Sequence, residues 1–377
     1  MKFLFVAPRF HTNLYYRVLA LQNKGHETLV LVLYKGKSEF YENISIKQVP
    51  LSGLSKLMIR LIRNVKKSNL KSHYEIILQS PGRRFVKEIK EFRPDFILLK
   101  EFKNVLAFKT ILTARKVNAK VLIFAQSQNA TIKGSVNLFR LMMRIFTRMN
   151  VKAFITPVMK TYQNFKETGI EIFYVPFVHP LCIHRDKQIP VEPGKIKILS
   201  IGKYVKRKDH ILLIKAAEIL LNKNYVIDVD FFGEVADTAY FDFLKNYVDT
   251  HRLNNRILLH SNVPYQRIKK EYSKHDLFVL PSYKEPAAYS PVEAMAYGLP
   301  VICSSDCGTN CYVENGVNGF VFKAHDAEDL ANKIEQAIID PDTLKKLSRN
   351  TNRLFRERHE VDVFAQKIEQ IISKLSI

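Results

Sequence analysis

Two glutamates and a run of cations are the residues whose types and spacing could do chemistry. Glu285 and Glu293 are separated by seven residues, and Gly202–His210 places four cations in six positions just before a predicted helix. Backbone N–H groups at a helix start, the helix dipole and ammonium charges together suit a diphosphate. A solvated basic turn is the alternative reading of the same run.

The two glutamates differ in how easily local structure explains them. Ser290 is a candidate N-cap, with Pro291 at the first helical position and Glu293 as the third residue of a capping box. The same geometry would turn the N–H groups of Tyr289 and Ser290 toward an anion. Glu285 lies in the loop before this helix and has no capping role, so it is the better catalytic candidate.

Two further patterns could indicate a metal site. Cys303, Cys307 and Cys311 recur at every fourth position, but the paired spacing of structural zinc sites is absent and Gly308 interrupts the segment. We interpret them as free thiols in a strand and a loop. The acidic pair in Asp228–Asp230 lies in a predicted strand and is interpreted as structural, so no metal is expected.

The elements that must position these residues read as repeated βα units. Short, nearly continuous apolar runs followed by longer amphipathic segments are typical of a parallel sheet covered on both faces. The first series of predicted strands is Lys2–Ala7, Glu27–Leu33, Phe96–Lys100, Val121–Ala125 and Ala153–Thr156. The second is Lys197–Gly202, Val226–Phe232, Ile257–Leu259, Leu277–Leu280, Pro300–Cys303 and Gly319–Phe322. The fold class is therefore α/β, with doubly wound, Rossmann-like parallel sheets, and ligands are expected beyond the carboxyl ends of the strands.

A length of 377 residues predicts two domains with a cleft between them. A proline-containing stretch near 178–195 separates the two strand series. We expect a first domain over 1–180, a second domain over 181–358, and a C-terminal helix over 359–377 that packs back on the first domain.

Composition narrows the partners. Apolar residues make up 47% of the chain, which suits globular domains, while 59 Lys and Arg against 36 Asp and Glu leave a net charge of +23. Such an excess favours a polyanionic partner: nucleic acid, anionic lipid or a phosphorylated substrate. No signal peptide or apolar run long enough for a bilayer is visible, so a cytoplasmic protein is expected, peripheral to the inner face of the membrane if its basic helices bind there.

Two basic, apolar segments carry that membrane hypothesis. The segment 54–67 has an apolar helical stripe with cations on the remaining positions, and no acid occurs from Leu51 to Tyr74. The segment 136–149 places Arg140, Arg144 and Arg148 on one stripe of an apolar helix. Both could lie in an anionic membrane interface, and both could instead be ordinary core-packed helices with a solvated face.

The run from Pro281 to Phe322 resembles retaining glycosyltransferases of the GT-B fold, in the large family that contains many bacterial lipopolysaccharide, capsule and mannosyl transferases. The resemblance rests on the paired glutamates followed by Ala294–Val301, which reads Ala-Met-Ala-Tyr-Gly-Leu-Pro-Val. It is clear over roughly 196–325 and weaker over 19–27. It implies two Rossmann-like domains facing a cleft, an acceptor-binding domain over 1–180 and a nucleotide-sugar-binding domain over 181–358.

The resemblance also implies roles for single residues. Lys203 and Lys208 match the cations that hold the donor diphosphate and stabilise the leaving group. Glu293 matches the carboxylate on the ribose hydroxyls, Tyr289 and Ser290 match backbone donors near phosphate and sugar, and Glu285 matches the glutamate facing the hexose. The resemblance thus implies a UDP- or GDP-sugar co-substrate, retention of configuration, and no metal or other cofactor.

Several positions depart from the family pattern. Its Glu-Gly-Phe-Gly is Glu285–Ala288 here, its glycine-rich first loop is replaced by a segment with His11 and Asn13, and its frequent histidine is replaced by a segment with Gln126 and Gln128. These four polar residues are candidates for the acceptor or sugar side. The departures leave open a catalytically inactive relative.

A polyanion-binding protein is the alternative of another class. It would explain the charge, but the sequence carries no helix-turn-helix, RNA-binding aromatic motif or zinc module, and the glutamate pair would have no role. We therefore expect no nucleic acid. The predicted partners are a nucleotide sugar and a glycan or lipid-linked acceptor, as in the synthesis of bacterial surface polysaccharides.

Overall fold

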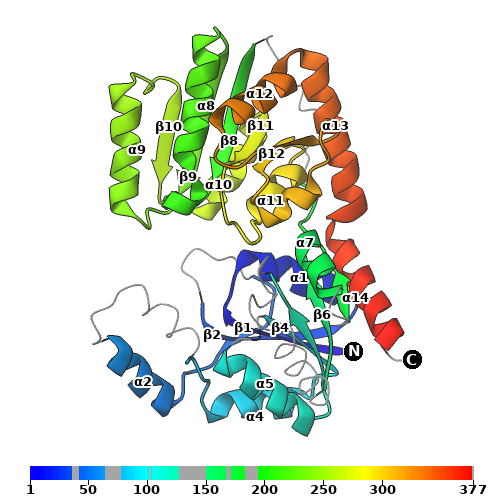
Figure 1. The fold of residues 1–377 in the computed structure, drawn as a ribbon. Helices are drawn as coiled ribbons and strands as arrows, with labels where there is room; N and C mark the ends of the chain where they lie inside the picture. The colour runs from blue at the N-terminus through cyan, green and yellow to red at the C-terminus, as the bar shows by residue number, and fades with distance from the viewer. Residues whose placement is uncertain are drawn as a thin grey trace. The chain divides into compact units, whose positions relative to one another are not determined.

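A computed structural model describes residues 1–35, 42–63, 78–100, 102, 104–126, 150–166, 171–182 and 194–375. The chain divides into two compact units. Met1–Pro176 together with Val361–Ile377 form what we call the first unit, and Phe177–Glu360 form the second unit (Figure 1). The predicted linker prolines, Pro190 and Pro193, lie outside the described residues.

The first unit is built on a parallel sheet with strand order β3-β2-β1-β4-β5-β6-β7. Central β1 is hydrogen-bonded on both sides, so that Leu4 lies opposite Leu29 of β2 and Ile97 of β4. The strands are β1 Lys2–Arg9, β2 Glu27–Tyr34, β3 Ile46–Gln48, β4 Phe96–Lys100, β5 Lys120–Phe124, β6 Val151–Thr156 and β7 Ile172–Tyr174. The side chains of β1, β2, β4, β5 and β6 are buried almost without interruption, as expected for strands covered on both faces, whereas the short edge strands β3 and β7 are only partly covered.

Helices cover this sheet. The helices described in the unit are α1 Thr12–Asn23, α2 Gly53–Arg63, α4 Arg83–Phe92, α5 Val105–Lys116, α7 Met159–Lys166 and α14 Val361–Leu375. The C-terminal helix α14 packs against α1, and the Arg17 guanidinium lies 6.0 Å from the ring centre of Phe364. The last residues of the chain therefore complete the unit in which the chain begins.

The second unit repeats the same plan with strand order β10-β9-β8-β11-β12-β13. Ile198 of β8 lies opposite Val229 of β9 and Leu277 of β11, so β8 is the central strand. The strands are β8 Lys195–Ile201, β9 Val226–Gly233, β10 Ile257–Ser261, β11 Leu277–Leu280, β12 Val301–Ser304 and β13 Gly319–Phe322.

Short polar side chains begin several helices of this unit. The carboxylates of Asp237, Asp326 and Asp340 accept hydrogen bonds from backbone N–H groups in the first turns of α9, α12 and α13. The helices described are α8 His210–Asn222, α9 Thr238–Thr250, α10 Tyr265–Glu271, α11 Ser290–Ala296, α12 Ala327–Ile338 and α13 Pro341–Arg358, with 3-10 turns η1 Lys206–Lys208, η2 Tyr272–Lys274 and η3 Gly308–Tyr312.

The expected fold class is confirmed: both units are parallel α/β sheets. Each predicted strand is present, with ends displaced by at most a few residues. The edge strands β3 and β7 were not predicted, because three residues are too short for an apolar run to stand out from a loop.

The metal-like patterns have structural explanations. Asp228 lies in β9 and pairs with Arg256, and Asp230 in the same strand pairs with His260 and His275. Cys303 is buried in β12, Cys307 directly precedes η3, and Cys311 lies within η3. None of these three cysteines, all in the described part of the chain, forms a disulfide. Among the helices described, none combines the length and the apolar character that a membrane span needs.

The end of β9 approaches the end of β8 so closely that only glycine fits. A Cβ atom on Gly233 would lie 2.1 Å from the carbonyl oxygen of Gly202. Because both contacting groups are backbone, neither can move aside as a flexible side chain would. This contact brings the turn after β8, which carries the cation run, against the turn after β9.

We therefore expect Gly233→Ala to destabilise the chain by about 3 kcal/mol, since the clash forces the ends of two central strands apart. Urea unfolding monitored by circular dichroism measures the loss. Gly53→Ala is the matched control, because a Cβ atom there meets nothing within 4 Å. Equal midpoints for Gly233→Ala and Gly53→Ala would contradict the close approach.

Candidate functional site

Glu285 is held in position by its backbone. Its N–H donates to the Asp306 carbonyl at 3.2 Å, and its own carbonyl accepts from the Gly308 N–H at 2.8 Å. The preceding Lys284 adopts a left-handed φ of 47° and donates its N–H to the Asp306 carboxylate at 2.7 Å. The loop after β11 is therefore fixed to the turn after β12.

The Glu285 carboxylate is buried between two cations. It is 6% exposed, forms an ion pair with Arg207, and lies 2.8 Å from the Lys208 ammonium. Burial alone would raise the pKa of this carboxyl, but the charges and hydrogen bonds of Lys208 and Arg207 hold the pKa below its ordinary value. Glu285 is consequently an anion at neutral pH.

The two cations come from the turn after β8. Residues Lys206–Lys208 form the 3-10 turn η1, and the Arg207 carbonyl accepts the Tyr283 N–H at 3.0 Å. The Lys208 stem lies over Gly202, where a Cβ atom would be 3.1 Å from Lys208 Cδ. Two separate turns at the carboxyl ends of the central strands β8 and β11 thus meet in one charge cluster.

Lys203 does not join that cluster in the same way. The Lys203 side chain is 53% exposed, and its ammonium lies 2.6 Å from the carboxylate of Glu234, just past the end of β9. Sequence reasoning paired Lys203 with Lys208 and passed over Arg207. The four-cation run gave a signal for Arg207, but only the conformation of η1 shows which of the cations face Glu285.

The capping-box interpretation of Glu293 is wrong. The residue at the N-cap of α11 is Tyr289, no side chain makes a cap hydrogen bond there, and Ser290 is already helical with Pro291. Glu293 instead turns to α10 and η2: the Tyr265 hydroxyl donates to one carboxylate oxygen, and the Tyr272 hydroxyl donates to the other at 3.1 Å. Neither tyrosine was identified from sequence, since no local pattern links them to Glu293.

The environment of Glu293 is unlike that of Glu285. Burial raises the pKa of the Glu293 carboxyl, and the hydrogen bonds from Tyr265 and Tyr272 only partly offset this. The neutral hydroxyls bind the carboxylate oxygens, and the positive charge of Lys269 acts on the carboxyl in the same direction, lowering its pKa. A buried acid with two fixed donors suits recognition of ligand hydroxyls, because the carboxylate is positioned before a ligand arrives.

Tyr289 and Ser290 bind neighbouring segments of the second unit through their side chains. The Tyr289 hydroxyl donates to the Val178 carbonyl at 2.7 Å, and its ring meets Phe177 edge-on at 5.5 Å. The Ser290 hydroxyl lies 3.4 Å from the Ile201 carbonyl. The role of their backbone N–H groups toward an anion stays a prediction.

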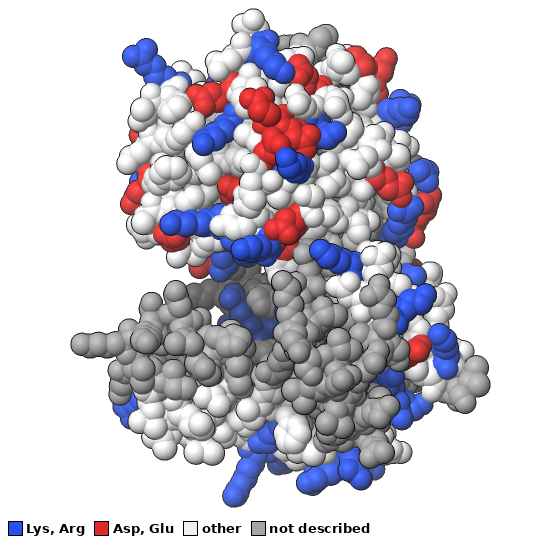
Figure 2. All heavy atoms as spheres, viewed as in Figure 1, with Lys and Arg blue, Asp and Glu red and all other residues white. Residues whose placement is uncertain are grey.

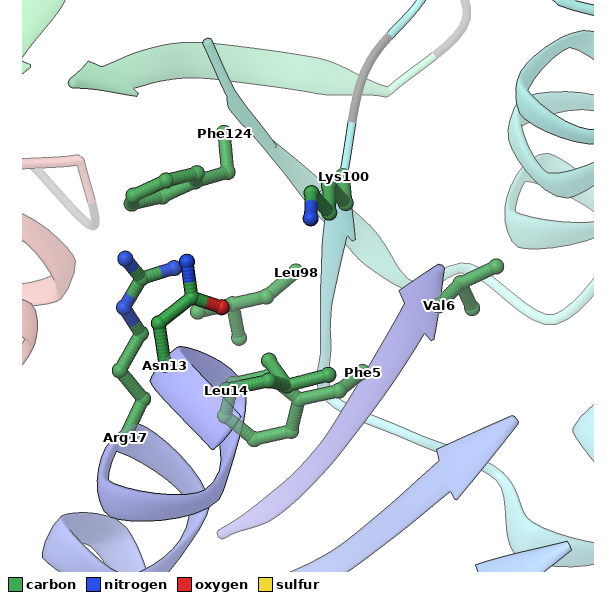
Figure 3. Close-up of a pocket in the computed structure, with 8 residues that line it drawn as sticks. All are labelled: Phe5, Val6, Asn13, Leu14, Arg17, Leu98, Lys100 and Phe124. Atoms are coloured by element: carbon green, nitrogen blue, oxygen red, sulfur yellow. The ribbon is translucent and has the colours of Figure 1, made fainter. Parts of the chain in front are cut away.

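The first unit contains a small cationic pocket at the carboxyl ends of β1, β4 and β5 (Figure 3). Asn13, one of the predicted residues, lines it together with Arg17 and Lys100, which were not predicted. The Arg17 guanidinium is 3.7 Å from the ring centre of Phe124. The pocket measures ≈ 20 Å³, room for about one water.

The other residues of the first unit that were predicted from sequence are His11, Gln126 and Gln128. His11 precedes α1 at its cap position without a cap hydrogen bond from its side chain, and Gln126 follows β5 as a half-buried residue. Gln128 and the segment 136–149 lie outside the described residues. Arg17 could have been found from its spacing, since it is one helical turn beyond Asn13 on the same face.

Residues 184–354 match the family described as "Glycosyl transferases group 1". A D-inositol 3-phosphate glycosyltransferase of Arthrobacter sp. (strain FB24) is 28% identical over 164 residues, 43% of this chain and 39% of that protein. The UDP-Gal:alpha-D-GlcNAc-diphosphoundecaprenol alpha-1,3-galactosyltransferase of Escherichia coli is 28% identical over 170 residues, 44% of this chain and 42% of that protein. The chain thus aligns with about two fifths of these relatives.

Solved structures are similar over the whole chain. A glycosyltransferase from Rickettsia africae ESF-5 superposes with a TM-score of 0.75 at 16% identity, covering 99% of this chain and 98% of that one. Anabaena Alr3699/HepE, solved in complex with UDP, gives a TM-score of 0.72 at 16% identity, covering 99% of this chain and 100% of that one. These likenesses show that the fold is that of the GT-B glycosyltransferases.

The contrasting environments of the glutamates predict opposite pH behaviour for two matched variants. The pKa of Glu293 is raised above 4.5, so the native state binds more protons and loses stability as pH rises through the raised pKa. Glu293→Gln removes that loss and is expected to be at least as stable as the unaltered chain at neutral pH. Urea unfolding at pH 4.5 and 7.5 measures how the free energy of unfolding of the variant and of the unaltered chain changes with pH.

Glu285→Gln is expected to behave in the opposite way. The pKa of Glu285 is lowered, so its stabilisation is present above pH 4.5 and is lost as pH falls through the lowered pKa. At pH 7.5 the variant should lose about 2 kcal/mol, less than a fully buried ion pair would cost, because the Arg207 side chain is 40% exposed. Shifts of the same sign in both variants would contradict this assignment.

Proposed function

We propose that this chain, of which residues 184–354 match the family described as "Glycosyl transferases group 1", is a glycosyltransferase of bacterial surface polysaccharide synthesis. It transfers a hexose from a nucleoside diphosphate sugar to a hydroxyl group of a glycan or lipid-linked acceptor. The second unit binds the donor and the first unit binds the acceptor.

The observation that carries the proposal is the cluster of Glu285, Arg207 and Lys208. A diphosphate needs cations, and the ammonium of Lys208 and guanidinium of Arg207 lie at the carboxyl ends of central strands, where α/β sheets bind ligands. In the absence of a phosphate both cations pair with the Glu285 carboxylate, which balances one of their two charges. An arriving diphosphate shares them, which leaves the carboxylate available to the hydroxyl groups of the donor sugar.

The proposed reaction keeps the configuration of the sugar. The bond between the anomeric carbon and the diphosphate oxygen breaks, and a bond from that carbon to the acceptor oxygen forms on the same face. The acceptor proton passes to the leaving phosphate oxygen, so the products are a glycoside and a nucleoside diphosphate. Lys208 and Arg207, assisted by Lys203, stabilise the charge that develops on the leaving group, a role that requires no metal.

Glu293 is the proposed anchor of the nucleotide. Its oxygens, fixed by Tyr265 and Tyr272, accept hydrogen bonds from the ribose hydroxyls. UDP is the favoured nucleotide over GDP, because UDP stands in the names of the Escherichia coli relative and of the HepE complex. The acceptor is proposed to carry negative charge, since Arg17 and Lys100 line the pocket beside Asn13.

We also propose that the first unit binds an anionic membrane surface. The unit has 33 Lys and Arg against 12 Asp and Glu, a net charge of +21, whereas the second unit has 26 against 24, a net charge of +2. Figure 2 shows basic and acidic atoms mixed over one face of the second unit. Nearly all of the excess charge therefore belongs to one unit.

Helix α2 has the features needed for the proposed contact with lipid. Over residues 53–61, where its side chains are described, the buried residues are Ser55 and Ile59, while the apolar residues Leu54, Leu57, Met58 and Leu61 are 69, 54, 38 and 59% exposed. Lys56 and Arg60 are exposed on the same helix. Apolar side chains can enter the acyl boundary while neighbouring cations remain at anionic headgroups.

The donor proposal is tested by a thermal-shift screen of UDP-, GDP-, ADP- and CMP-sugars, followed by a transfer assay. UDP-sugars are expected to raise the melting temperature most, because a ligand that binds only the native state stabilises it. Lys208→Ala should weaken nucleotide binding by ~10–100-fold, the value of a charged hydrogen bond to phosphate. Glu285→Gln should abolish transfer.

Lys203→Ala is the matched comparison, because Lys203 is more exposed and lies beside Glu234. It should weaken nucleotide binding less than Lys208→Ala does. A chain that no sugar nucleotide stabilises, or full transfer activity in Glu285→Gln, would overturn the proposed function. Nucleotide binding without transfer to any hydroxyl acceptor would identify an inactive relative.

The membrane proposal predicts that the double variant Leu57→Glu, Leu61→Glu loses binding to anionic vesicles by at least ~10-fold, because it places charge on the face that enters the lipid. Cosedimentation with vesicles of phosphatidylglycerol and phosphatidylcholine measures the loss. Leu258→Glu is the control, since Leu258 is 46% exposed in the second unit. Equal sedimentation of all three proteins, or equal binding to pure phosphatidylcholine, would refute the contact.

A further inference from the structure

The second unit contains a groove that the proposed donor site does not use. Its volume is ≈ 570 Å³, within the range typical of ligand sites. Four segments line it, each following the carboxyl end of a strand: the turns after β8, β11 and β13, and the first turns of α9 after β9. The side chains that matter are Lys206, Asp209, Tyr240, Phe243, Tyr283 and His325.

Aromatic rings from two parts of the chain line the groove. Tyr240 and Phe243 stack with their ring centres 6.2 Å apart, and Phe243 is 49% exposed. Tyr283 and His325 form a second pair with ring centres 4.7 Å apart. Tyr240 is buried, so the exposed rings of Phe243 and His325 are the ones that offer a flat surface to a ligand.

Polar groups of both signs accompany the rings. The Asp209 carboxylate is 3.5 Å from His325 Nδ1, and the exposed ammonium of Lys206 is the cation in the lining. The Asp209 carboxylate and the Lys206 ammonium carry opposite charges, so the groove has little net charge, unlike the cationic cluster around Glu285. The groove therefore lacks the excess positive charge that a phosphate needs.

We propose that this groove binds a neutral saccharide unit of the glycan that the enzyme extends, separate from the donor sugar. A pyranose ring has a C–H face that fits an aromatic ring and a rim of hydroxyls that fits a carboxylate and an ammonium group. The inference rests on the proposed glycosyltransferase function, because that function supplies a glycan to hold.

The groove is joined to the charge cluster through the backbone. Lys206 directly precedes Arg207, which pairs with Glu285, and the Tyr283 N–H donates to the Arg207 carbonyl at 3.0 Å. A saccharide that contacts Lys206 and Tyr283 is thus one residue from Arg207 and two from Glu285. Such a subsite would keep the glycan beside the enzyme between transfers.

The test uses the lack of tryptophan in this chain. Phe243→Trp places a single fluorescent reporter in the groove, and Phe108→Trp places one at a 50% exposed position of α5 in the first unit. Maltotriose, β-1,4-galactobiose and N,N′,N″-triacetylchitotriose, all neutral, are titrated into each full-length protein. At least one saccharide is expected to change the Phe243→Trp emission saturably, with saturating UDP present, and to leave Phe108→Trp unchanged.

Two results would overturn the proposal that the groove binds a saccharide. Either none of the three saccharides alters the Phe243→Trp emission, or UDP alone produces the change and abolishes that of the saccharides, which would assign the groove to the nucleotide. Failure of the proposed function is distinguishable, because the thermal shift with UDP-sugars reports the donor site independently. Saccharide binding without a nucleotide response would refute the donor site and retain the groove.

A kinetic comparison adds a readout that a structural role would not move. Phe243→Ala should raise the KM for a saccharide acceptor by ~5–10-fold, the value of one aromatic contact, with kcat and the donor KM unchanged. Phe108→Ala, the equally exposed control, should leave all three constants unchanged. A fall in kcat with an unchanged acceptor KM would contradict the proposed subsite.

Discussion

The buried negative charge of Glu285 is the constraint on which the candidate site depends. A carboxylate removed from water is costly unless cations and hydrogen bonds compensate it. Arg207 and Lys208 provide this compensation, and they can do so because the turn after β8 is held against Tyr283 while the loop after β11 is held against Asp306 and Gly308. Three strand ends are thus tied to one charge, and the close approach of Gly233 to Gly202 adds a fourth.

The second glutamate shows the complementary solution. Glu293 is satisfied by the hydroxyls of Tyr265 and Tyr272, and burial raises its pKa, whereas cations lower that of Glu285. The two glutamates, separated by only seven residues, therefore lie in environments suited to different ligand groups. We propose that the charge-compensated carboxylate of Glu285 lies where a phosphate-bearing sugar binds, and that the carboxylate of Glu293, held by neutral donors, binds hydroxyl groups.

The distribution of charge separates the tasks of the two units. Almost all of the net charge of +23 belongs to the first unit, so cations and acids nearly balance in number over the second unit. Outward leucines on α2 add an apolar surface to the basic unit. The unit proposed to bind the acceptor is therefore the one suited to anionic lipid.

The sequence by itself determined the class of fold, nearly every buried strand, the cation run and both glutamates, because apolar periodicity and motif spacing are local properties. Only the tertiary structure decided that Arg207 and Lys208 face Glu285 while Lys203 pairs with Glu234, and that Tyr265 and Tyr272, rather than a helix start, hold Glu293. It also revealed Arg17 and Lys100 beside Asn13, and turned the leucines of α2 outward. Most of those relations join residues far apart in the chain, and they escaped sequence reasoning because the packing of strand ends brings them together. Arg17 is the exception, since it lies one helical turn from Asn13.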